Sequence, residues 1–335
     1  MSQLRYFGLL ALVIGFAGIA YGQANERDRS PGRIEIPKKE TVGKWQPVAG
    51  GTQIPLWPES VTLTKPDSGD QPEATGNGSP TVAGRKWHWA TYVTQPTMTV
   101  YKPIGKNTGA TILVIPGGGF HAVATDLEGT EICDWVIQQG MTCAMLKYRT
   151  AQVWRREKGP SKRPEVLLAL EDAQRAISLL RHRASTYEID PNKIGVIGFS
   201  AGAYVAANMS NSFERTYPLT DEADRVSPRP DFAVIAYTAR LWDTRKGRNT
   251  LELAPWVKIS AKAPPTLIIH AMNDPIDDIR HPMAYALALN DVGVQVDVRF
   301  YATGGHAFGM RATADPITTQ WPNQMTQWLR NIGVL

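Results

Sequence analysis

Hydrophobic positions along the chain follow two alternating patterns from about residue 97 onward. Short β-branched or apolar runs predict strands, and apolar residues three or four positions apart predict helices. Val166, Leu170, Ala173 and Ile177, for example, share one face of a predicted helix. The predicted strands are residues 97–101, 111–115, 142–148, 193–197, 231–237, 266–270 and 294–301, and the predicted helices are residues 128–139, 165–184, 203–209, 282–290 and 321–330.

This alternation predicts an α/β fold with a mostly parallel central sheet and helices on both faces. We assign residues 78–335 to this domain. Residues 25–77 are rich in Pro, Gly, Lys, Asp and Ser, and this composition predicts an extended, partly disordered arm. Within the arm, Ile54–Pro58 is expected to lie on the domain as an apolar anchor.

Residues 1–24 have the pattern of a secretory signal peptide, because Arg5 precedes an uncharged stretch from Tyr6 to Ala24. Cleavage is expected after Gly22 or Ala24. An uncleaved membrane anchor is the alternative, but the glycines and the length, short for a bilayer span, argue against it. We therefore expect a secreted or periplasmic protein without stable membrane insertion.

Composition narrows the class of protein further. Of the 335 residues, 43% are hydrophobic, enough for a full core. The chain has 36 basic and 31 acidic residues, and the basic residues form no cluster along the sequence, which argues against a nucleic-acid partner. Only two cysteines are present, Cys133 and Cys143. A disulfide is possible in an exported protein, and two buried thiols are equally compatible with the sequence. Neither cysteine has the partners of a zinc site.

The motif Gly198–Gly202 places Ser200 between a predicted strand and a predicted helix. Such a turn exposes the serine hydroxyl, and glycines two residues away on each side avoid clashes with the neighbouring strand and helix. The motif occurs by chance in many chains, but its strand-turn-helix context favours a nucleophile.

A serine nucleophile needs a general base, and the chain has six histidines. His182 is expected on a helix surface, His270 in the core, and His88 and His281 in structural roles. His306 lies in a glycine-framed loop after the final predicted strand. Functional residues concentrate in such loops, so His306 is the predicted base.

The imidazole in turn needs a carboxylate to fix its tautomer. Asp274 follows the predicted strand 266–270 and precedes Pro275, and is preferred over its close neighbours Asp277 and Asp278. A turn-forming Asp-Pro pair is the structural alternative. The chain order Ser200, Asp274, His306 is that of α/β-hydrolases.

Donors for an oxyanion are expected at the glycine-rich segment 116–120, directly after the strand 111–115. The candidates are the amides of Gly118, Gly119 and Ala201. A phosphate cradle is the alternative, but the spacing of a phosphate-binding loop is absent. Phe120 and His121, which follow the glycines, are candidate substrate contacts.

Together these motifs resemble the α/β-hydrolase superfamily and, within it, the bacterial acetylxylan-esterase and feruloyl-esterase-like group related to dienelactone hydrolases. The resemblance extends from about Ile54 to Leu335 and rests also on Glu128–Gly129, Lys147–Arg149, Asp172–Ala176 and Arg229–Phe232. It implies serine esterase chemistry at Ser200, Asp274 and His306, without metal or organic cofactor. Relatives usually carry glycine where this chain has Ala203 and Ala307, which puts pocket shape in doubt more than catalysis.

We therefore expect a secreted serine esterase that removes ester groups, above all O-acetyl groups, from a polysaccharide such as xylan. Trp87, Trp89, Trp154 and Trp242 are placed in loops and are the candidates for stacking on sugars, although most tryptophans are packing residues. The alternatives are a general carboxylesterase or peptidase of the same fold, and a non-catalytic carbohydrate-binding relative. A glycosidase is disfavoured because no opposed pair of carboxylates is recognisable.

Overall fold

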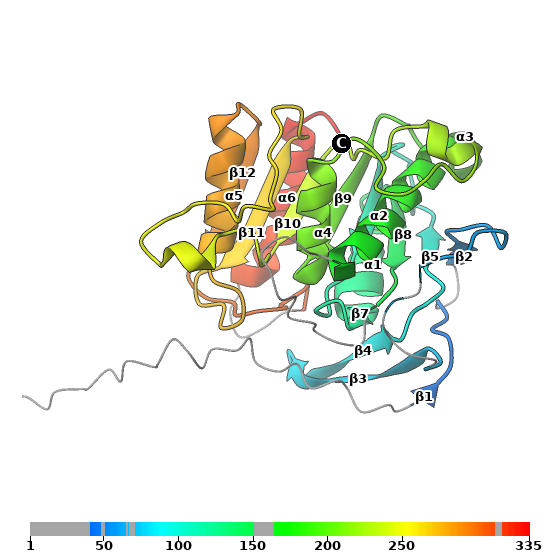
Figure 1. Ribbon diagram of the computed structural model, residues 1–335, viewed down its shortest axis with the longest axis horizontal. Coiled ribbons are helices and arrows are strands. Elements are labelled where there is room, and N and C mark those ends of the chain that lie inside the picture. Colours follow the sequence, from blue (N-terminus) through cyan, green and yellow to red (C-terminus); the bar gives the residue numbers. More distant parts are fainter. Residues whose placement is uncertain (1–40, 48–50, 65, 67–70, 151–163, 312–316) are drawn as a thin grey trace, which may run out of the picture. The chain divides into compact units, whose positions relative to one another are not determined.

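The computed structural model describes residues 41–47, 51–64, 66, 71–150, 164–311 and 317–335 (Figure 1). The described residues all belong to one compact unit. The predicted signal peptide, residues 1–24, lies outside the described residues.

The central sheet has eight strands in the order β12-β11-β10-β9-β6-β8-β5-β2. Neighbours from β12 to β8 are parallel, and β5 and β2 continue the sheet in antiparallel fashion. This confirms the expected mostly parallel sheet. The strands are β2 (Thr52–Pro55), β5 (Thr97–Tyr101), β6 (Thr111–Ile115), β8 (Thr142–Lys147), β9 (Ile194–Phe199), β10 (Ala233–Ala236), β11 (Thr266–Ala271) and β12 (Val296–Tyr301).

Helices cover both faces of this sheet (Figure 1). One face packs against α2 (Pro164–His182), α4 (Ala201–Ser210) and α5 (Arg280–Asp291), and the other packs against α1 (Glu131–Gln138) and α6 (Ile317–Asn331). A π-helical turn (Asp126–Thr130) precedes α1, a short α3 (Ala184–Tyr187) follows α2, and two 3₁₀ turns lie at Glu222–Arg225 and Thr244–Lys246.

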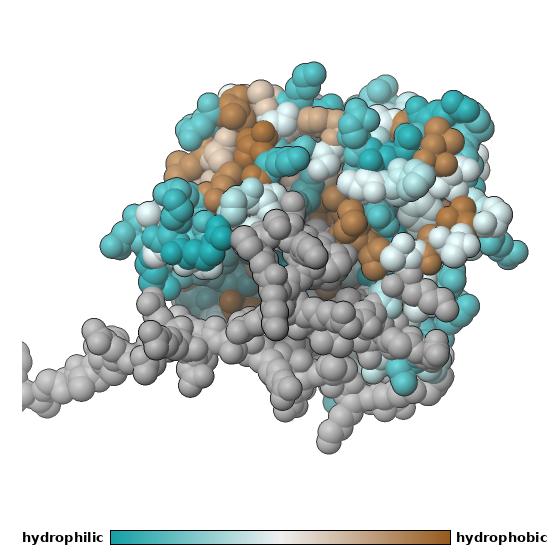
Figure 2. Space-filling model, viewed as in Figure 1, coloured by the Kyte–Doolittle hydropathy of each residue, from teal (hydrophilic) through white to brown (hydrophobic). Residues whose placement is uncertain are grey.

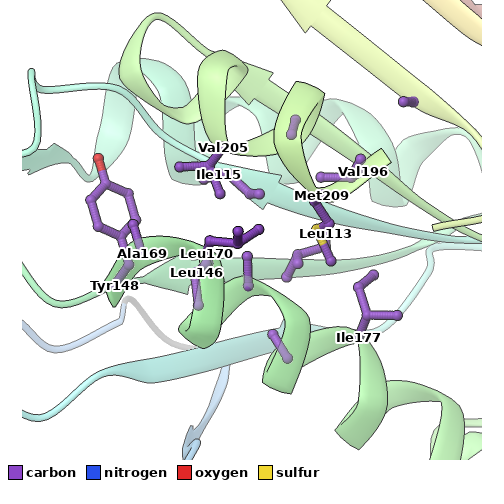
Figure 3. Close-up of a cluster of buried hydrophobic side chains, with 14 of the residues drawn as sticks. Leu113, Ile115, Leu146, Tyr148, Ala169, Leu170, Ile177, Val196, Val205 and Met209 are labelled. Carbon is purple, nitrogen blue, oxygen red and sulfur yellow. The ribbon is translucent and has the colours of Figure 1, made fainter. Parts of the chain in front are cut away.

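The central strands are buried on both faces, which explains their continuous apolar sequences. All five residues of β6, Thr-Ile-Leu-Val-Ile, are buried. Figure 3 shows Leu113 and Ile115 of β6 beside Leu170 and Ile177 of α2. Leu170 and Ile177 lie on one face of α2, and this face packs on the sheet. The apolar spacing in the sequence therefore marks the buried face of the helix.

A disulfide joins Cys133 of α1 to Cys143 of β8. Their Cα atoms are 5.3 Å apart, within the usual range for such a bond. This bond resolves the choice between a disulfide and two buried thiols that the sequence left open.

A smaller antiparallel sheet has the order β1-β3-β4-β7, with β1 (Thr41–Val42), β3 (Ala74–Val82), β4 (Arg85–Thr91) and β7 (Ala122–Ala124). Trp87 and Trp89 belong to β4, so their assignment to a loop was wrong. A Cβ on Gly78 would lie 1.9 Å from the Trp87 indole, and a Cβ on Gly76 would lie 2.3 Å from that of Trp89. The indoles therefore cover the glycines of the partner strand, and Trp89 is fully buried.

The described part of the arm belongs to the folded unit. Thr52–Pro55 form β2 at the edge of the central sheet, and a boundary between residues 77 and 78 would cut β3. Trp57 is 9% exposed and lies 5.7 Å from the guanidinium groups of both Arg149 and Arg175. The expected apolar anchor is thus fixed to the domain by packing and cation–π contacts.

The surface over α2, α4 and α5 mixes polar and apolar residues (Figure 2). Exposed apolar side chains around α5 and β12 include Leu287, Val292 and Val298. Scattered exposed apolar side chains are ordinary on globular proteins. Among the described helices, none is both long and apolar enough to cross a membrane.

Candidate active site

The candidate site lies where the connectivity of the central sheet reverses. β6 and β9 are parallel neighbours, but the chain runs from β6 outward to β8 and from β9 outward to β10 in the opposite direction. The loops that leave the carboxyl ends of β6 and β9 therefore diverge, and such a switch point is the usual ligand crevice of open α/β sheets. The glycine-rich segment follows β6, and Ser200 follows β9.

Ser200 occupies a strained turn between β9 and α4, with φ 51° and ψ −116°. A Cβ on Gly198 would lie 2.2 Å from the Gly202 carbonyl oxygen, and a Cβ on Gly202 would lie 2.0 Å from the Ile115 carbonyl oxygen. Both glycines are therefore required by close backbone contacts. Strain of this kind costs roughly 1–3 kcal/mol and is typical of functional turns.

The structure brings Ser200, His306 and Asp274 together. His306 Nε2 lies 3.1 Å from Ser200 Oγ, and His306 Nδ1 lies 2.7 Å from Asp274 Oδ2. In the tautomer with its proton on Nδ1, His306 donates to Asp274 and accepts from the serine hydroxyl. The arrangement allows the hydroxyl proton to pass to the imidazole during attack on a carbonyl.

Asp277 and Asp278 differ in their relation to this cluster. Asp277 Oδ2 lies 3.8 Å from His306 Nδ1, whereas Asp278 pairs with Arg248 and Arg280 at 3.0 Å each. Burial raises the pKa of Asp277 to about 6. Asp274 is the carboxylate at hydrogen-bonding distance, and Asp277 is a second carboxylate beside the same imidazole nitrogen.

Charges around His306 favour its protonated form. Burial by itself lowers the pKa of His306, but the hydrogen bond to Asp274 and the negative charges of Asp277, Asp274 and Glu128 outweigh burial and raise it. The imidazolium formed after proton transfer from a serine is therefore stabilised at this position.

The glycine loop packs directly against the serine turn. A Cβ on Gly117 would lie 2.9 Å from the Ser200 Cβ. The carbonyl oxygen of Gly118 accepts hydrogen bonds from the amides of His121 and Ala122, each at 3.0 Å. Gly118 and Gly119 follow Gly117 on this loop, and Ala201 follows Ser200 at the start of α4.

The predicted substrate contacts lie mostly in packed positions. Phe120 is 2% exposed, with Arg240 over its ring at 5.6 Å, and His121 is also buried. Trp242 is buried, with its ring 5.8 Å from that of His281, so its indole offers no open platform for a sugar. Trp154 lies outside the described residues. None of the three described aromatic side chains forms an exposed wall.

The other histidines have the environments expected from the sequence. His182 is exposed on α2, and His88 is exposed on β4. His270 is fully buried, with Nε2 3.0 Å from the Asp277 carbonyl oxygen. His281 Nδ1 accepts a hydrogen bond from the Trp242 amide at 3.0 Å.

Two buried residues beside the site, Glu128 and Tyr237, were not among the predicted site residues. The Tyr237 hydroxyl donates to Glu128 Oε1 at 2.9 Å, and the Gly117 amide donates to Glu128 Oε2 at 2.7 Å. Glu128–Gly129 was recognised only as part of the family resemblance. Tyr237 carried one signal, its place at the end of a predicted strand, where site residues gather in parallel sheets.

A polar, open hollow of about 470 Å³ is lined by residues of α1 and α6. It is lined by Arg85, Glu131, Asp134, Trp135, Gln138, Met310, Pro322 and Asn323. The half-buried Trp135 indole lies in this hollow among carboxylate, amide and guanidinium groups. Among the side chains that the structure describes, no group of three or more His, Cys, Asp or Glu residues could hold a metal ion.

Two protein-family models match overlapping parts of the chain. The BD-FAE family matches residues 98–234, and the prolyl oligopeptidase family matches residues 169–332. Together the two matches include Gly118, Ser200, Asp274 and His306.

Individual relatives include two proteins with xylan-related names, and others that are carboxylic ester hydrolases by name. The chain is 24% identical over 247 residues to an acetylxylan esterase of Xylanibacter ruminicola, covering 67% of this chain and 46% of the relative. It is 26% identical over 224 residues to an endo-1,4-beta-xylanase B of Butyrivibrio fibrisolvens, covering 63% of this chain and 34% of the relative. The chain thus spans less than half the length of these two relatives.

A solved structure extends the likeness over most of the chain. An acetyl ester-xyloside bifunctional hydrolase from Caldicellulosiruptor lactoaceticus has a TM-score of 0.64 at 26% identity, covering 85% of this chain and 97% of that one. The apo form of Thermogutta terrifontis esterase 2 has a TM-score of 0.57 at 21% identity, which shows the shared fold. Its match covers 76% of this chain and 97% of that one.

Proposed function

Since the chain belongs to the α/β-hydrolase superfamily and has esterase relatives, we propose that it is a serine esterase acting on O-acetyl groups of a polysaccharide such as xylan. The observation that carries this proposal is the chain of contacts from Ser200 through His306 to Asp274. The acetylxylan esterase and the xylan-directed relatives support the substrate class.

The reaction follows from the contacts. Ser200 Oγ attacks the ester carbonyl carbon while His306 Nε2 accepts its proton and Asp274 stabilises the imidazolium. The amides of Gly118, Gly119 and Ala201 are the proposed donors to the oxyanion. The carbon–oxygen bond to the sugar then breaks, and the sugar oxygen takes the proton from His306. A water molecule, deprotonated by His306, releases the acid and regenerates Ser200.

We also propose that the protein is exported, with residues 1–24 as the signal peptide. The Cys133–Cys143 disulfide supports this, because disulfides persist mainly in oxidising compartments. Size comparison of cellular precursor and exported protein, with the mature N-terminus sequenced, tests this proposal.

An ester panel tests the function. We expect hydrolysis of p-nitrophenyl acetate and acetylated xylan, weaker turnover of p-nitrophenyl butyrate and methyl ferulate, and loss of all activity in Ser200→Ala. Ser212→Ala, a half-buried serine beyond the end of α4, is the matched control. Activity that survives Ser200→Ala removes this serine from the mechanism. Wild-type protein that neither hydrolyses an ester nor reacts with a fluorophosphonate would instead be a non-catalytic carbohydrate-binding relative.

Peptide-bond hydrolysis is the second candidate, because the prolyl oligopeptidase family matches residues 169–332. A proline p-nitroanilide peptide tests it with the same variants. Turnover of the anilide in preference to every ester would assign the protein to the peptidases, whereas turnover of simple esters without acetylated xylan would indicate a general carboxylesterase.

A further inference from the structure

The carboxyl group of Glu128 is enclosed directly beside the glycine loop. Glu128 is 2% exposed, and its two oxygens accept from the Gly117 amide at 2.7 Å and the Tyr237 hydroxyl at 2.9 Å. A carboxyl group without hydrogen bonds would be very unfavourable in such a place. These two bonds therefore tie together one backbone segment and one side chain that are distant in sequence.

The hydrogen bond from the Gly117 amide to Glu128 fixes the position of the glycine loop relative to the serine turn. Gly117 immediately precedes Gly118, a proposed oxyanion donor. A Cβ on Gly117 would lie 2.7 Å from Glu128 Oε2, 2.8 Å from the Phe199 carbonyl oxygen and 2.9 Å from the Ser200 Cβ. The loop is thus held between the Glu128 carboxyl group and the residues at the end of β9.

The second bond fixes an aromatic ring against the general base. Tyr237 follows β10, between the strand ends that carry Ser200 and Asp274, and its ring lies edge-on to His306 with centroids 5.2 Å apart. Its backbone has φ 38°, a region that favours glycine and strains a tyrosine. The hydroxyl bond to Glu128 and the contact with Phe308, at 4.7 Å between centroids, hold the ring in this position.

We infer that Glu128 is a positioning residue. It holds the glycine loop and, through Tyr237, the His306 imidazole at the positions relative to Ser200 that the reaction requires. This inference rests on the proposed serine esterase function. Glu128 acts through Gly117 and Tyr237, and its own hydrogen bonds go to neither Ser200 nor His306. Because oxyanion donors act on the transition state, losing these positions lowers kcat and leaves KM nearly unchanged.

The test compares Glu128→Ala, Glu128→Gln and Tyr237→Phe in p-nitrophenyl acetate hydrolysis. A displacement of about 1 Å in a catalytic group costs about 100-fold, so we expect Glu128→Ala to lower kcat by about 30- to 100-fold with KM within about twofold. Glu128→Gln keeps the length and an acceptor for the Gly117 amide, and should lose less than about fivefold. Tyr237→Phe keeps the ring and should lose about three- to tenfold.

Tyr285→Phe is the matched control, because this fully buried hydroxyl hydrogen-bonds Asn211 at 2.9 Å and contacts no site residue named above. It should keep wild-type kcat. Affinity for a boronic acid, which forms a tetrahedral adduct on the serine, should weaken in Glu128→Ala by the same factor as kcat/KM. A purely structural role would lower the melting temperature without changing either quantity in the folded protein.

The outcomes separate the two claims. If Ser200→Ala is active, the proposed function fails. If Ser200→Ala is inactive while folded Glu128→Ala keeps wild-type kcat, the positioning role alone fails, and it also fails if Glu128→Gln loses as much kcat as Glu128→Ala. Should Glu128→Ala not fold, Glu128→Gln and Tyr237→Phe decide, and wild-type kcat in Tyr237→Phe overturns the coupling to His306.

Discussion

The carboxylate of Asp277 lies 3.8 Å from Nδ1 of His306, the same nitrogen that Asp274 contacts at 2.7 Å. Asp274 thus makes the direct bond, and Asp277 adds a second negative charge at longer range. The two residues are three positions apart in the loop after β11, so both can lie near the same imidazole nitrogen.

Replacing the two carboxylates should give unequal losses. Asp274→Asn removes the partner that fixes the imidazole tautomer and should lower kcat by about 10³- to 10⁴-fold. Asp277→Asn leaves that bond intact and should lower kcat by less than about tenfold. Steady-state kinetics on p-nitrophenyl acetate measures both, with Asp278→Asn, whose carboxylate pairs with Arg248 and Arg280, as the control. Equal losses at positions 274 and 277 would contradict this division of roles.

The pH profile should report the charges around His306. The imidazole must be neutral to accept the serine proton, so kcat/KM falls as pH decreases through the His306 pKa. Asp274, Asp277 and Glu128 face this imidazole with negative charge and raise that pKa, while the Tyr237 ring covers one side. Asp277→Asn removes one raising charge, so the acid limb should move to lower pH. A shift to higher pH would show that Asp277 does not act as a charge on His306.

The disulfide should stabilise the fold without taking part in turnover. Cys133 and Cys143 are ten positions apart, a loop for which chain entropy predicts about 2–3 kcal/mol. The double variant Cys133→Ala/Cys143→Ala should lose about that much free energy of unfolding in urea, with kcat unchanged at a temperature where it stays folded. Met141→Ala, a buried residue between the two cysteines, is a packing control that keeps the bond. The loss of unfolding free energy in Met141→Ala should persist under a reducing agent. The double variant and wild-type protein should then have similar free energies of unfolding, because neither contains the disulfide.

Ala307 should accept glycine readily. Its φ of 55° lies in the left-handed region, where a Cβ costs about 1 kcal/mol. Ala307→Gly should raise the free energy of unfolding by up to about 1 kcal/mol and leave kcat within about twofold. Ala203→Gly, in the interior of α4, should destabilise by about 1 kcal/mol instead. Thermal unfolding distinguishes the two, and a loss of stability at position 307 would show that the methyl group is needed for packing.

Trp135 should matter for polymer and not for small esters. Its indole lines the 470 Å³ hollow, and Met310 in the same hollow follows His306 along one segment. Trp135→Ala should raise KM for acetylated xylan by about threefold to tenfold, with p-nitrophenyl acetate kinetics unchanged. Trp45→Ala, a half-buried indole that does not line this hollow, is the control. An equal effect on both substrates would indicate a packing role.

Much of the sheet could be predicted because its central strands are buried on both faces. The apolar run of β6 and the spacing of Leu170, Ala173 and Ile177 on α2 reflect burial directly. The proximity of Ser200, Asp274 and His306 follows from the same pattern, since each comes after the end of a parallel strand. Predicting the strands therefore also predicted the edge where these side chains meet.

Contacts between distant segments were beyond local patterns. Trp87 and Trp89 lie flat on glycines of β3, a partner strand that proline- and glycine-rich composition concealed. The Glu128 carboxyl group is buried because Gly117 and Tyr237 provide donors from two other strand ends. A lone glutamate near a predicted helix gives no local sign of such an environment.

The short strand β7 has a mechanical consequence. It pairs with β4 of the smaller sheet and begins at Ala122, just beyond the glycine loop that leaves β6. The glycine loop is therefore held at both ends: it leaves β6 of the central sheet and enters β7 of the smaller sheet. A substitution that changes the tilt of the β3–β4 hairpin should therefore shift the glycine loop beside Ser200, although no residue of the candidate site itself is changed.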